Sequence, residues 1–453
     1  MKRLKLSLIL LLGVGVLNGY AQTELTLQQA LQYALSNNQQ LSRTRMEEDM
    51  GRLKTSEIRA QALPQINGNA KYTNNIKNAV IPVPGEMVGK PAGTTELLPM
   101  GLQHNVTAGA DLSQQIFNQS VFTGLKAAKS GEEYYKMQTA LSEETVIYNV
   151  TQLYYQTLVT REKMNVLDAN IDKISKLLET TASQVKNGLA KKIDEDRMKV
   201  NLTNYKTQRT QLMNQLQVQA NQLKQSMGMA IETEISLPRT SFAEIEKKTA
   251  TAVDFGGLNL DNRTEYKLLK KQEELQGMQK KAYIAEYYPS LSAFANYSYN
   301  GLSNKFDFLK SGANSTANMY SMAAVGVTLK IPIFDGFARR SKVSQANVTL
   351  RQLNKQIEET SLALNTAYAN AKLQVQNNLT TIRAQQENVD LANEVYSSTQ
   401  NNYNLGLANL TDLLDAETSL TAAQNNYNEA LLQYKLAELD IIKSNGGLKT
   451  LLN

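Results

Sequence analysis

The distribution of proline constrains this chain of 453 residues more than any other feature of its sequence. A proline inside a helix breaks it, and none of the 8 prolines lies in residues 100–237 or after Pro332. These two stretches can therefore hold very long helices. Four prolines gather between residues 82 and 99 together with three glycines, and this composition predicts a loop.

Apolar residues in the proline-free stretches recur every seven positions. One such series is Leu413, Leu420, Tyr427, Tyr434 and Ile441. A period of about 3.5 residues sustained in this way is typical of a coiled-coil seam. An ordinary amphipathic bundle is the alternative. It explains less well the uninterrupted run over residues 120–186, which would be roughly 100 Å long as a helix.

Four shorter segments alternate between apolar and polar residues. They predict β-strands at about 65–75, 105–115, 290–300 and 322–332. Each has the length of about 9–11 residues that a tilted strand needs to cross a bilayer. One face of each strand would be apolar, in places with tyrosines, and the other polar. Two soluble hairpins with one wet face are the alternative that the pattern alone leaves open.

The chain also has the pattern of a tandem repeat. Pro64 and Pro289 each end a helical pattern and begin a strand, and similar Gly-Leu-Ala turns follow at Gly188 and Gly406. Each half has the order helix, strand, loop, strand, long helix, turn, helix. The predicted divisions are a first repeat at 22–228, a linker or equatorial segment at 229–257 and a second repeat at 258–453.

Residues 1–21 have the pattern of a secretory signal peptide. Three basic residues precede a short apolar run, and Gly19 and Ala21 occupy the small-residue positions of a cleavage site. Removing this segment lowers the formal net charge from +6 to +3, which argues against a nucleic-acid partner. No later segment is apolar for the roughly 18 residues that a transmembrane helix needs.

Few residues with catalytic chemistry are present. The chain has no cysteine and one histidine, His104, which excludes disulfides, a cysteine nucleophile and a cysteine-ligated metal. We recognise no nucleophile–base pair, phosphate-binding loop or metal cluster, so we predict no enzyme activity, cofactor or metal site. The acidic run 194–196 is interpreted as the solvated start of a helix.

The four predicted strands restrict how the chain could cross a membrane. A sheet of four strands has two open edges, and every backbone N–H and C=O must be paired in lipid. Several copies of the chain would therefore have to pool their strands into one closed barrel. The helices leave the same end of both hairpins and would continue this barrel, with polar residues along its lumen. These features predict a conduit.

On these residues the chain resembles the TolC family of outer-membrane efflux channels. The resemblance rests on the duplicated plan, the junctions at Pro64 and Pro289, the segment 331–336 and above all the segment 403–417. It implies an α+β membrane protein, a homotrimer with a 12-stranded β-barrel, four strands per protomer, in the outer membrane of a Gram-negative bacterium. A long periplasmic α-helical coiled-coil barrel would continue it.

The resemblance also implies a function and partners. The trimer would be the passive exit duct of a tripartite efflux or secretion system. It would receive small molecules or exported protein from an inner-membrane transporter through a periplasmic adaptor, with lipid around the barrel and without a cofactor. The alternative is a non-transporting periplasmic or surface coiled-coil structural protein, which a heat-resistant β-barrel extracted from outer membranes would exclude.

Gate residues follow from the same resemblance. Asp412 and Asp415 would form acidic rings at the periplasmic entrance, near Tyr403. Like charges in such a throat repel one another and favour cations. The alternative for Asp412 is that it complements the dipole at a helix N-terminus. Some family members close the gate through a tyrosine and an arginine, but Ala408 stands at the arginine position, so that link cannot form here.

The two turns are the implied docking sites for the adaptor. Their residues are Gly188, Leu189, Ala190, Gly406, Leu407 and Ala408. The alternative is a pair of tight helix–helix turns that need glycine for backbone reasons alone. Lys191 and Lys192 beside the first turn are candidates to replace the missing arginine link, with solvated side chains as the alternative.

Overall fold

The computed structural model describes residues 24–238, 257–308 and 316–452. The predicted signal peptide, the first two residues of the predicted mature chain and most of the predicted linker lie outside these residues. Two compact units are formed. The helical unit comprises the described residues of Met1–Arg43, Ala140–Arg263 and Leu362–Asn453, and the sheet unit comprises those of Thr44–Thr139 and Thr264–Ser361. Each unit therefore takes segments from both predicted repeats.

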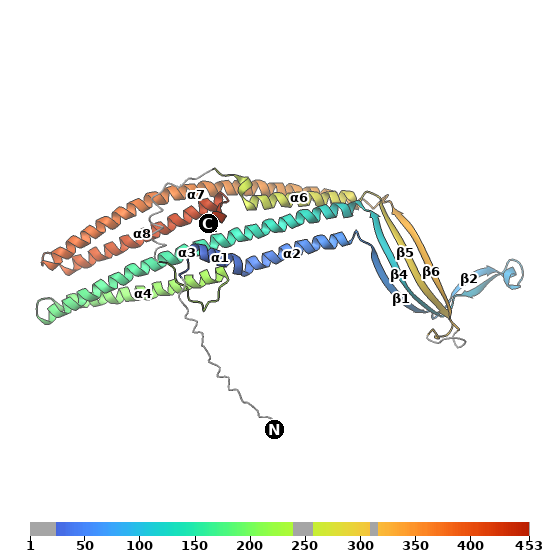
Figure 1. Cartoon of the computed structure of the whole chain (residues 1–453), viewed down its shortest axis with the longest axis horizontal. Helices are drawn as coiled ribbons and strands as arrows, with labels where there is room; N and C mark the ends of the chain where they lie inside the picture. The colour runs from blue at the N-terminus through green and yellow to red at the C-terminus, as the bar shows by residue number, and fades with distance from the viewer. Residues whose placement is uncertain (1–23, 239–256, 309–315, 453) are drawn as a thin grey trace, which may run out of the picture. The chain divides into compact units, whose positions relative to one another are not determined.

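Long helices occupy both proline-free stretches. The α-helices are α1 (Leu27–Asn37), α2 (Gln39–Ala60), α3 (Gln119–Lys186), α4 (Lys192–Met227), α6 (Thr264–Ala285), α7 (Ala338–Asn404) and α8 (Leu410–Ser444) (Figure 1). The short 3₁₀ helices are η1 (Gly85–Val88), η2 (Leu260–Asn262) and η4 (Leu448–Leu452). Helices α3 and α7 contain 68 and 67 residues, and each is followed by a turn and a second helix. None of the described helices is both long and apolar enough to span a membrane.

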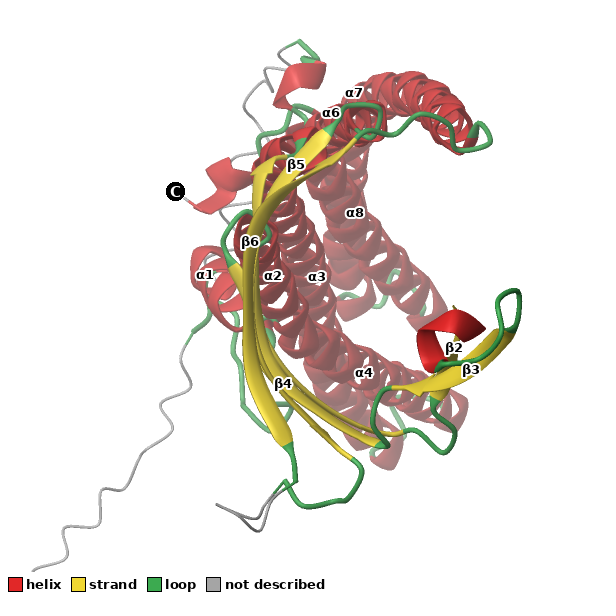
Figure 2. Cartoon of the chain, turned by 90° about the vertical axis from the view of Figure 1, so that its right-hand side faces the viewer, coloured by secondary structure: helices red, strands yellow, loops and turns green. Residues whose placement is uncertain are grey.

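The strands form one large sheet and one small one. They are β1 (Gln65–Asn74), β2 (Ala79–Pro84), β3 (Thr95–Met100), β4 (His104–Phe117), β5 (Ser290–Ser303) and β6 (Asn318–Lys330). The large sheet is antiparallel with the order β1-β4-β5-β6, and it is curved (Figure 2). Strands β1 and β6 each pair on one side only, so this chain leaves both edges of the sheet open.

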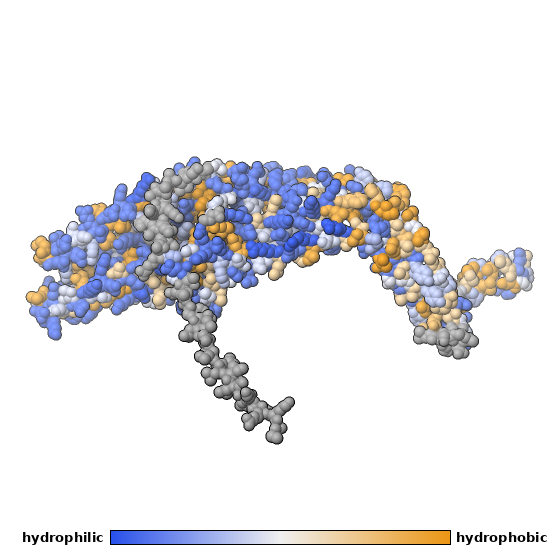
Figure 3. Space-filling model, viewed as in Figure 1, coloured by the Kyte–Doolittle hydropathy of each residue, from blue (hydrophilic) through white to orange (hydrophobic). Residues whose placement is uncertain are grey.

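The register of the large sheet places the four predicted apolar series on one face. Ile66 pairs with Leu112, Leu112 with Ala295, and Ala295 with Val325. Because side chains two residues apart share a face, the tyrosines at 72, 297 and 299 lie on it as well. Several of these side chains are exposed in the single chain, including Val325 at 84%. In the space-filling view, apolar residues gather over the sheet and its junction with the helices (Figure 3).

The opposite face of the sheet carries most of its polar side chains, although Phe294 and Met322 also lie on it. Asn69 donates from its Nδ2 to Asp111 of the neighbouring strand, and Thr107 Oγ1 donates to Asn300 Oδ1 at 2.9 Å. These bonds join β1 to β4 and β4 to β5. The sheet therefore presents an apolar surface on one side and hydrogen-bonding side chains on the other, as strands between lipid and water require.

The predicted loop in the proline-rich segment is wrong, because this segment forms the hairpin of β2 and β3. The three prolines of these strands fall in alternate cross-strand pairs, at Pro82, Pro84 and Pro99. Gly85 N–H donates to Thr94 O at 2.7 Å. Because hydrogen-bonded and non-hydrogen-bonded pairs alternate along an antiparallel ladder, the neighbouring pair of Pro84 and Thr95 is a non-hydrogen-bonded pair. All three proline nitrogens therefore point away from the partner strand, where no N–H is needed.

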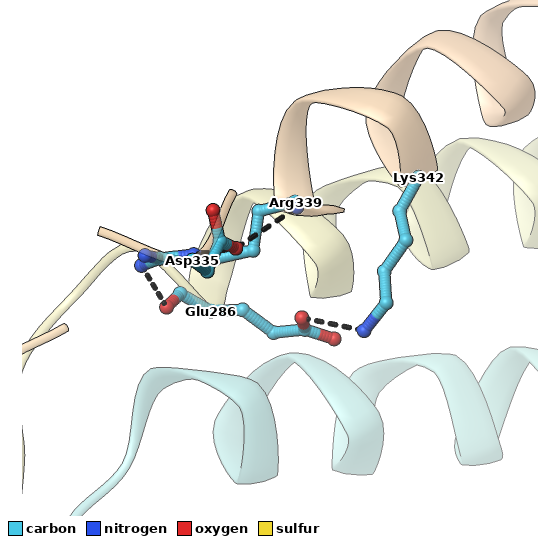
Figure 4. A network of polar contacts seen from close by, with 4 residues as sticks. All are labelled: Glu286, Asp335, Arg339 and Lys342. Carbon is cyan, nitrogen blue, oxygen red and sulfur yellow. Dashed lines mark hydrogen bonds and ion pairs between the residues drawn. The ribbon is translucent and has the colours of Figure 1, made fainter. Parts of the chain in front are cut away.

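An ion-pair network holds the junctions between strands and helices in the sheet unit (Figure 4). Asp335 Oδ2 accepts from the backbone N–H of Arg339 at 3.0 Å and from its Nε at 2.6 Å. Arg339 also donates to the carbonyl of Glu286, whose carboxylate binds Lys342 Nζ at 2.8 Å. The end of α6 is thereby fixed to the start of α7, and the bonds from Arg339 lower the pKa of Asp335.

The helical unit contains the main core. Its largest buried cluster joins α1, the start of α2, α3, α4, α7, α8 and η4, and Tyr154 and Tyr434 are among its fully buried side chains. Helix α3 lies beside α4, and α7 beside α8 (Figure 1). Most positions of the seven-residue series in α8 are buried, with Leu413 1% and Ile441 2% exposed. The seam therefore packs the helices against one another, as its period predicts.

Candidate docking and gate site

The turns after α3 and α7 have the same hydrogen bonds. Leu189 N–H donates to Gln184 O, and Leu407 N–H donates to Asn402 O, both at 2.8 Å. Gly188 and Gly406 have φ angles of 73° and 75°, a left-handed conformation that favours glycine. Leu189 and Leu407 point outward and are 79% and 76% exposed. Each turn thus ends its helix tightly and presents an exposed leucine.

One groove lies between these two turns. Its volume is about 1080 Å³. Of the residues predicted for docking and gating, it is lined by Leu189, Ala190, Tyr403, Gly406, Ala408 and Asp412. Gly188, Leu407 and Asp415 do not line it. The structure thus brings residues of both predicted turns into one concave surface. The two turns are far apart in the sequence, so their positions along the chain did not predict this.

Asp412 has a structural task at the start of α8. Asn409 Oδ1 accepts from Asp412 N–H at 3.0 Å, and Asp412 Oδ2 accepts from Asn409 N–H at 3.2 Å. This reciprocal pair is a capping box. It supports the helix-end interpretation of Asp412 but leaves the carboxylate exposed. Asp415 lies three residues later and is also exposed, so both carboxylates lie on the open side of α8.

Of the two lysines proposed in place of the missing arginine link, Lys192 has a side chain that is 60% exposed, in keeping with the solvated alternative. Lys192 pairs with Glu195 at 2.8 Å and Asp196 at 3.3 Å on its own helix. A link between the hairpins comes instead from Arg197 of α4, whose Nη1 donates to Thr411 Oγ1 of α8 at 3.0 Å. The sequence contained no obvious sign of this contact, because the two residues meet only through the packing of α4 near α8.

Tyr403 is half-buried and joins two small apolar clusters near the turns. One contains Ile174, Met198, Leu410 and Leu414, and the other contains Tyr396, Leu413, Ala416 and Leu420. Tyr403 therefore packs where the last turn of α7 meets α3, α4 and α8. The predicted solvated start of α4 is only partly solvated, since Glu195 is 9% exposed and binds Lys192 and Lys199.

Glu417 is the most unusual charged residue near the turns. It is 3% exposed, and its Oε1 has no hydrogen-bond partner. Lys173 of α3 acts electrostatically on Glu417, and Glu417 in turn acts on Tyr205 of α4 and Tyr396 of α7. Lys173 Nζ lies 5.3 Å from the centre of the Tyr396 ring. A carboxyl group is therefore enclosed where all four long helices meet.

Burial raises the pKa of Glu417 to about 7, although the charge of Lys173 opposes this shift. The residue occupies a position between Leu413 and Leu420 in the seam of α8. A glutamate at such an inward position is a sign of a buried carboxyl group that the sequence contains. The periodic pattern did not reveal it, because that pattern is defined by the large apolar residues alone. Among the described residues, no group of histidine, aspartate and glutamate side chains could hold a metal ion.

Comparison with known proteins supports the predicted resemblance. Residues 269–447 match the family model described as outer membrane efflux protein. The chain is 21% identical to outer membrane protein TolC of Escherichia coli strain K12, over 99% of this chain and 87% of that protein. The relation thus extends over both halves of the chain, whereas the family model covers part of the second.

Solved structures show the same fold. The outer membrane protein VceC of Vibrio cholerae superposes with a TM-score of 0.71 at 17% identity, covering 93% of this chain and 96% of that one. The CmeC outer membrane channel of Campylobacter jejuni gives 0.72 at 16% identity, covering 93% and 86%. The likeness extends over nearly the whole chain, so the fold of the chain is shared with these proteins.

Proposed function

We propose, from the premise that this chain is a relative of the TolC-type outer membrane efflux proteins, that three copies of it form one passive exit duct. The strands lie in the outer membrane, and the helices extend into the periplasm. The duct belongs to a tripartite efflux or secretion system and accepts cargo from an inner-membrane transporter through an adaptor. The observation that carries this proposal is the sheet with one apolar face and two open edges.

Those open edges decide the assembly. An unpaired strand edge is costly in hydrocarbon, where no water can satisfy its N–H and C=O groups. Edge β1 of one copy can pair with edge β6 of the next, and three copies of the four-stranded sheet then close a barrel of 12 strands. The apolar face turns to lipid and the polar face to the lumen.

The groove between the turns is the proposed docking site for the adaptor. It is concave and lined by the exposed Leu189 beside polar residues, and the exposed Leu407 of the second turn offers a further apolar contact outside it. Asp412 and Asp415 contribute six carboxylates to the entrance of a trimer. Tyr403 packs beneath this entrance and supports the closed arrangement of the helices.

Replacing Gly188 and Gly406 with valine is expected to abolish most export while leaving trimers intact. No atom lies within 4 Å of a side chain added at either glycine, but the left-handed backbone costs a branched residue roughly 1–2 kcal/mol. The turns should therefore rearrange locally. The measurement is restoration of the resistance or secretion that a deletion strain has lost. Gly131→Val, within α3 and also without close neighbours, is the control; full restoration by the turn variants would refute docking there.

The link between Arg197 and Thr411 is the proposed replacement for the absent arginine lock. We expect Arg197→Ala and Thr411→Val each to increase the fraction of time that single channels stay open. The double variant should add little to either one, because both changes remove the same hydrogen bond. A coupling energy of about 0.5–1 kcal/mol is the expected size. Strictly additive effects in planar bilayers would show that this contact does not restrain the gate.

A further inference from the structure

The hairpin of β2 and β3 is apolar on both of its faces. Cross-strand pairing puts Val80, Pro82, Leu97 and Pro99 on one face and Ala79, Ile81, Leu98 and Met100 on the other. Leu97 is 63% and Met100 51% exposed in the single chain. Apolar residues also cover part of the hairpin in the space-filling view (Figure 3). An isolated two-stranded hairpin is marginally stable in water, and exposed apolar patches mark interaction sites.

Hydrogen bonds hold the base of this hairpin in a defined position. Asn75 N–H donates to Gln103 O at 2.7 Å, and Asn75 Nδ2 donates to Leu102 O at 3.0 Å. Gln103 N–H reaches Asn304 Oδ1 at 3.3 Å, which ties the base to the segment after β5. The hairpin is therefore attached to both strand connections at the end of the sheet farthest from the helices. The apolar surface of the hairpin therefore belongs to a strand pair whose base is fixed by hydrogen bonds.

Prolines weaken both edges of the hairpin as sites for an added strand. The nitrogens of Pro82 and Pro84 face outward along β2, and that of Pro99 faces outward along β3. The edge of β2 thereby loses two of its three outward N–H donors, and the edge of β3 loses one of three. The apolar side chains on the faces of the hairpin are therefore its larger interaction surface.

The position of the hairpin identifies this partner. It lies on the concave side of the large sheet (Figure 2), and a closed barrel encloses that side while lipid covers the convex side. We propose that the hairpins of three copies pack against one another through their apolar faces and narrow the outer mouth of the barrel. This proposal rests on the trimeric duct proposed above. The occupant of the apolar surface is thus a second copy of the chain.

Cross-linking tests the contact directly, because the chain has no cysteine of its own. Leu98→Cys places one thiol per copy on the proposed contact face. A short bismaleimide should join copies of this variant in intact cells and in purified trimers. Met46→Cys is the control, because Met46 lies on α2, outside the hairpin, and is 64% exposed. Failure of Leu98→Cys copies to cross-link in intact trimers would overturn the proposal.

Deletion tests the consequence. Ala79 and Met100 are paired, so residues 79–100 can be removed and Asn78 joined to Gly101 through one glycine. We expect the single-channel conductance to rise about twofold or more, because the narrowest part of the outer mouth is lost. Unchanged conductance would contradict a constriction. A second variant, with threonine at Val80, Ile81, Leu97 and Leu98, keeps the strands and should also raise conductance.

Two further outcomes are distinguishable. A fluorophore on Leu98→Cys that is quenched by brominated lipids would show that the hairpin enters the membrane, which would overturn packing between copies. The proposed duct itself is tested by the unaltered chain. If heat-resistant trimers with channel activity form but the hairpins neither cross-link nor restrict current, the constriction fails and the duct stands. If the unaltered chain forms no channel, the proposed function fails.

Discussion

Replacing Glu417 with glutamine is expected to remove most of the pH dependence of helix packing near the turns. The pKa of Glu417 is about 7, against an ordinary value of 4.5, a difference worth roughly 3 kcal/mol. Between about pH 4.5 and pH 7 the folded protein keeps a proton that the unfolded chain has released. The stability of the folded state therefore falls as pH rises through this window. Above pH 7 the carboxylate is ionised while buried, and the whole loss of stability remains.

Glutamine keeps the size of the side chain and stays neutral, so the variant should be stabilised at pH 8 and little changed below pH 4.5. Hydrogen exchange of residues 410–425, corrected for intrinsic rates, measures this effect. We expect exchange at pH 8 to slow by up to about a hundredfold relative to the unaltered protein. Equal pH dependence in the two proteins would contradict the buried, proton-binding role of Glu417.

Glu429→Gln provides the matched control with the opposite sign. Burial raises the pKa of Glu429, but hydrogen bonds from Lys163 and Gln433 outweigh it and hold this pKa below its ordinary value. Its carboxylate therefore contributes stability at neutral pH, and this contribution is lost as pH falls. Replacing Glu429 should speed hydrogen exchange of the backbone amides around it in α8 at pH 8, whereas Glu417→Gln should slow the exchange around residue 417. A general effect of replacing a glutamate in α8 would move both variants in the same direction.

Replacing Asp412 and Asp415 together with asparagine is expected to reduce the preference of the channel for cations by about tenfold. Three copies of the chain place six carboxylates at the entrance, and the substitution removes all of this charge. Asparagine at position 412 keeps an oxygen that can accept from Asn409 N–H, so the helix cap is retained. An effect on selectivity can then be separated from an effect on folding.

The measurement is the reversal potential in planar bilayers under a salt gradient, together with block by a multivalent cation. Both the cation preference and the block should weaken in the double variant. The control is Glu358→Gln with Glu359→Gln, which removes the same number of exposed charges from α7 in the sheet unit. An unchanged reversal potential in the Asp412 and Asp415 variant would show that the acidic rings do not select ions.

Much of the fold could be predicted because it depends on local periodicity. The seven-residue series in α8 and the alternation in β1, β4, β5 and β6 state directly which side of each element is buried or apolar. The β2–β3 hairpin was missed because proline content indicates a loop on average. A proline fits a strand only at a position whose nitrogen faces away from the partner strand. Here the hydrogen bond between Gly85 and Thr94 sets the register that gives Pro84 such a position, and the sequence alone does not reveal this register.

Less of the candidate site could be predicted, since its geometry comes from packing between distant segments. The glycine turns were identified from spacing, but the groove exists only because both turns come together. Arg197 and Thr411 are 214 residues apart, and no periodic pattern relates them. The roles of Asp412, Asp415 and Tyr403 at an entrance remain predictions from the resemblance. The capping box of Asp412 is a separate structural finding.

Single-channel recording of the purified, unaltered protein in planar lipid bilayers tests the central claim most directly. A closed barrel built from the sheets of three copies should give discrete, long-lived conductance steps with voltage as the only driving force. No nucleotide or inner-membrane partner should be needed. A protein that inserts without any conductance, or that stays soluble and produces none, would contradict the duct and favour a structural coiled-coil protein.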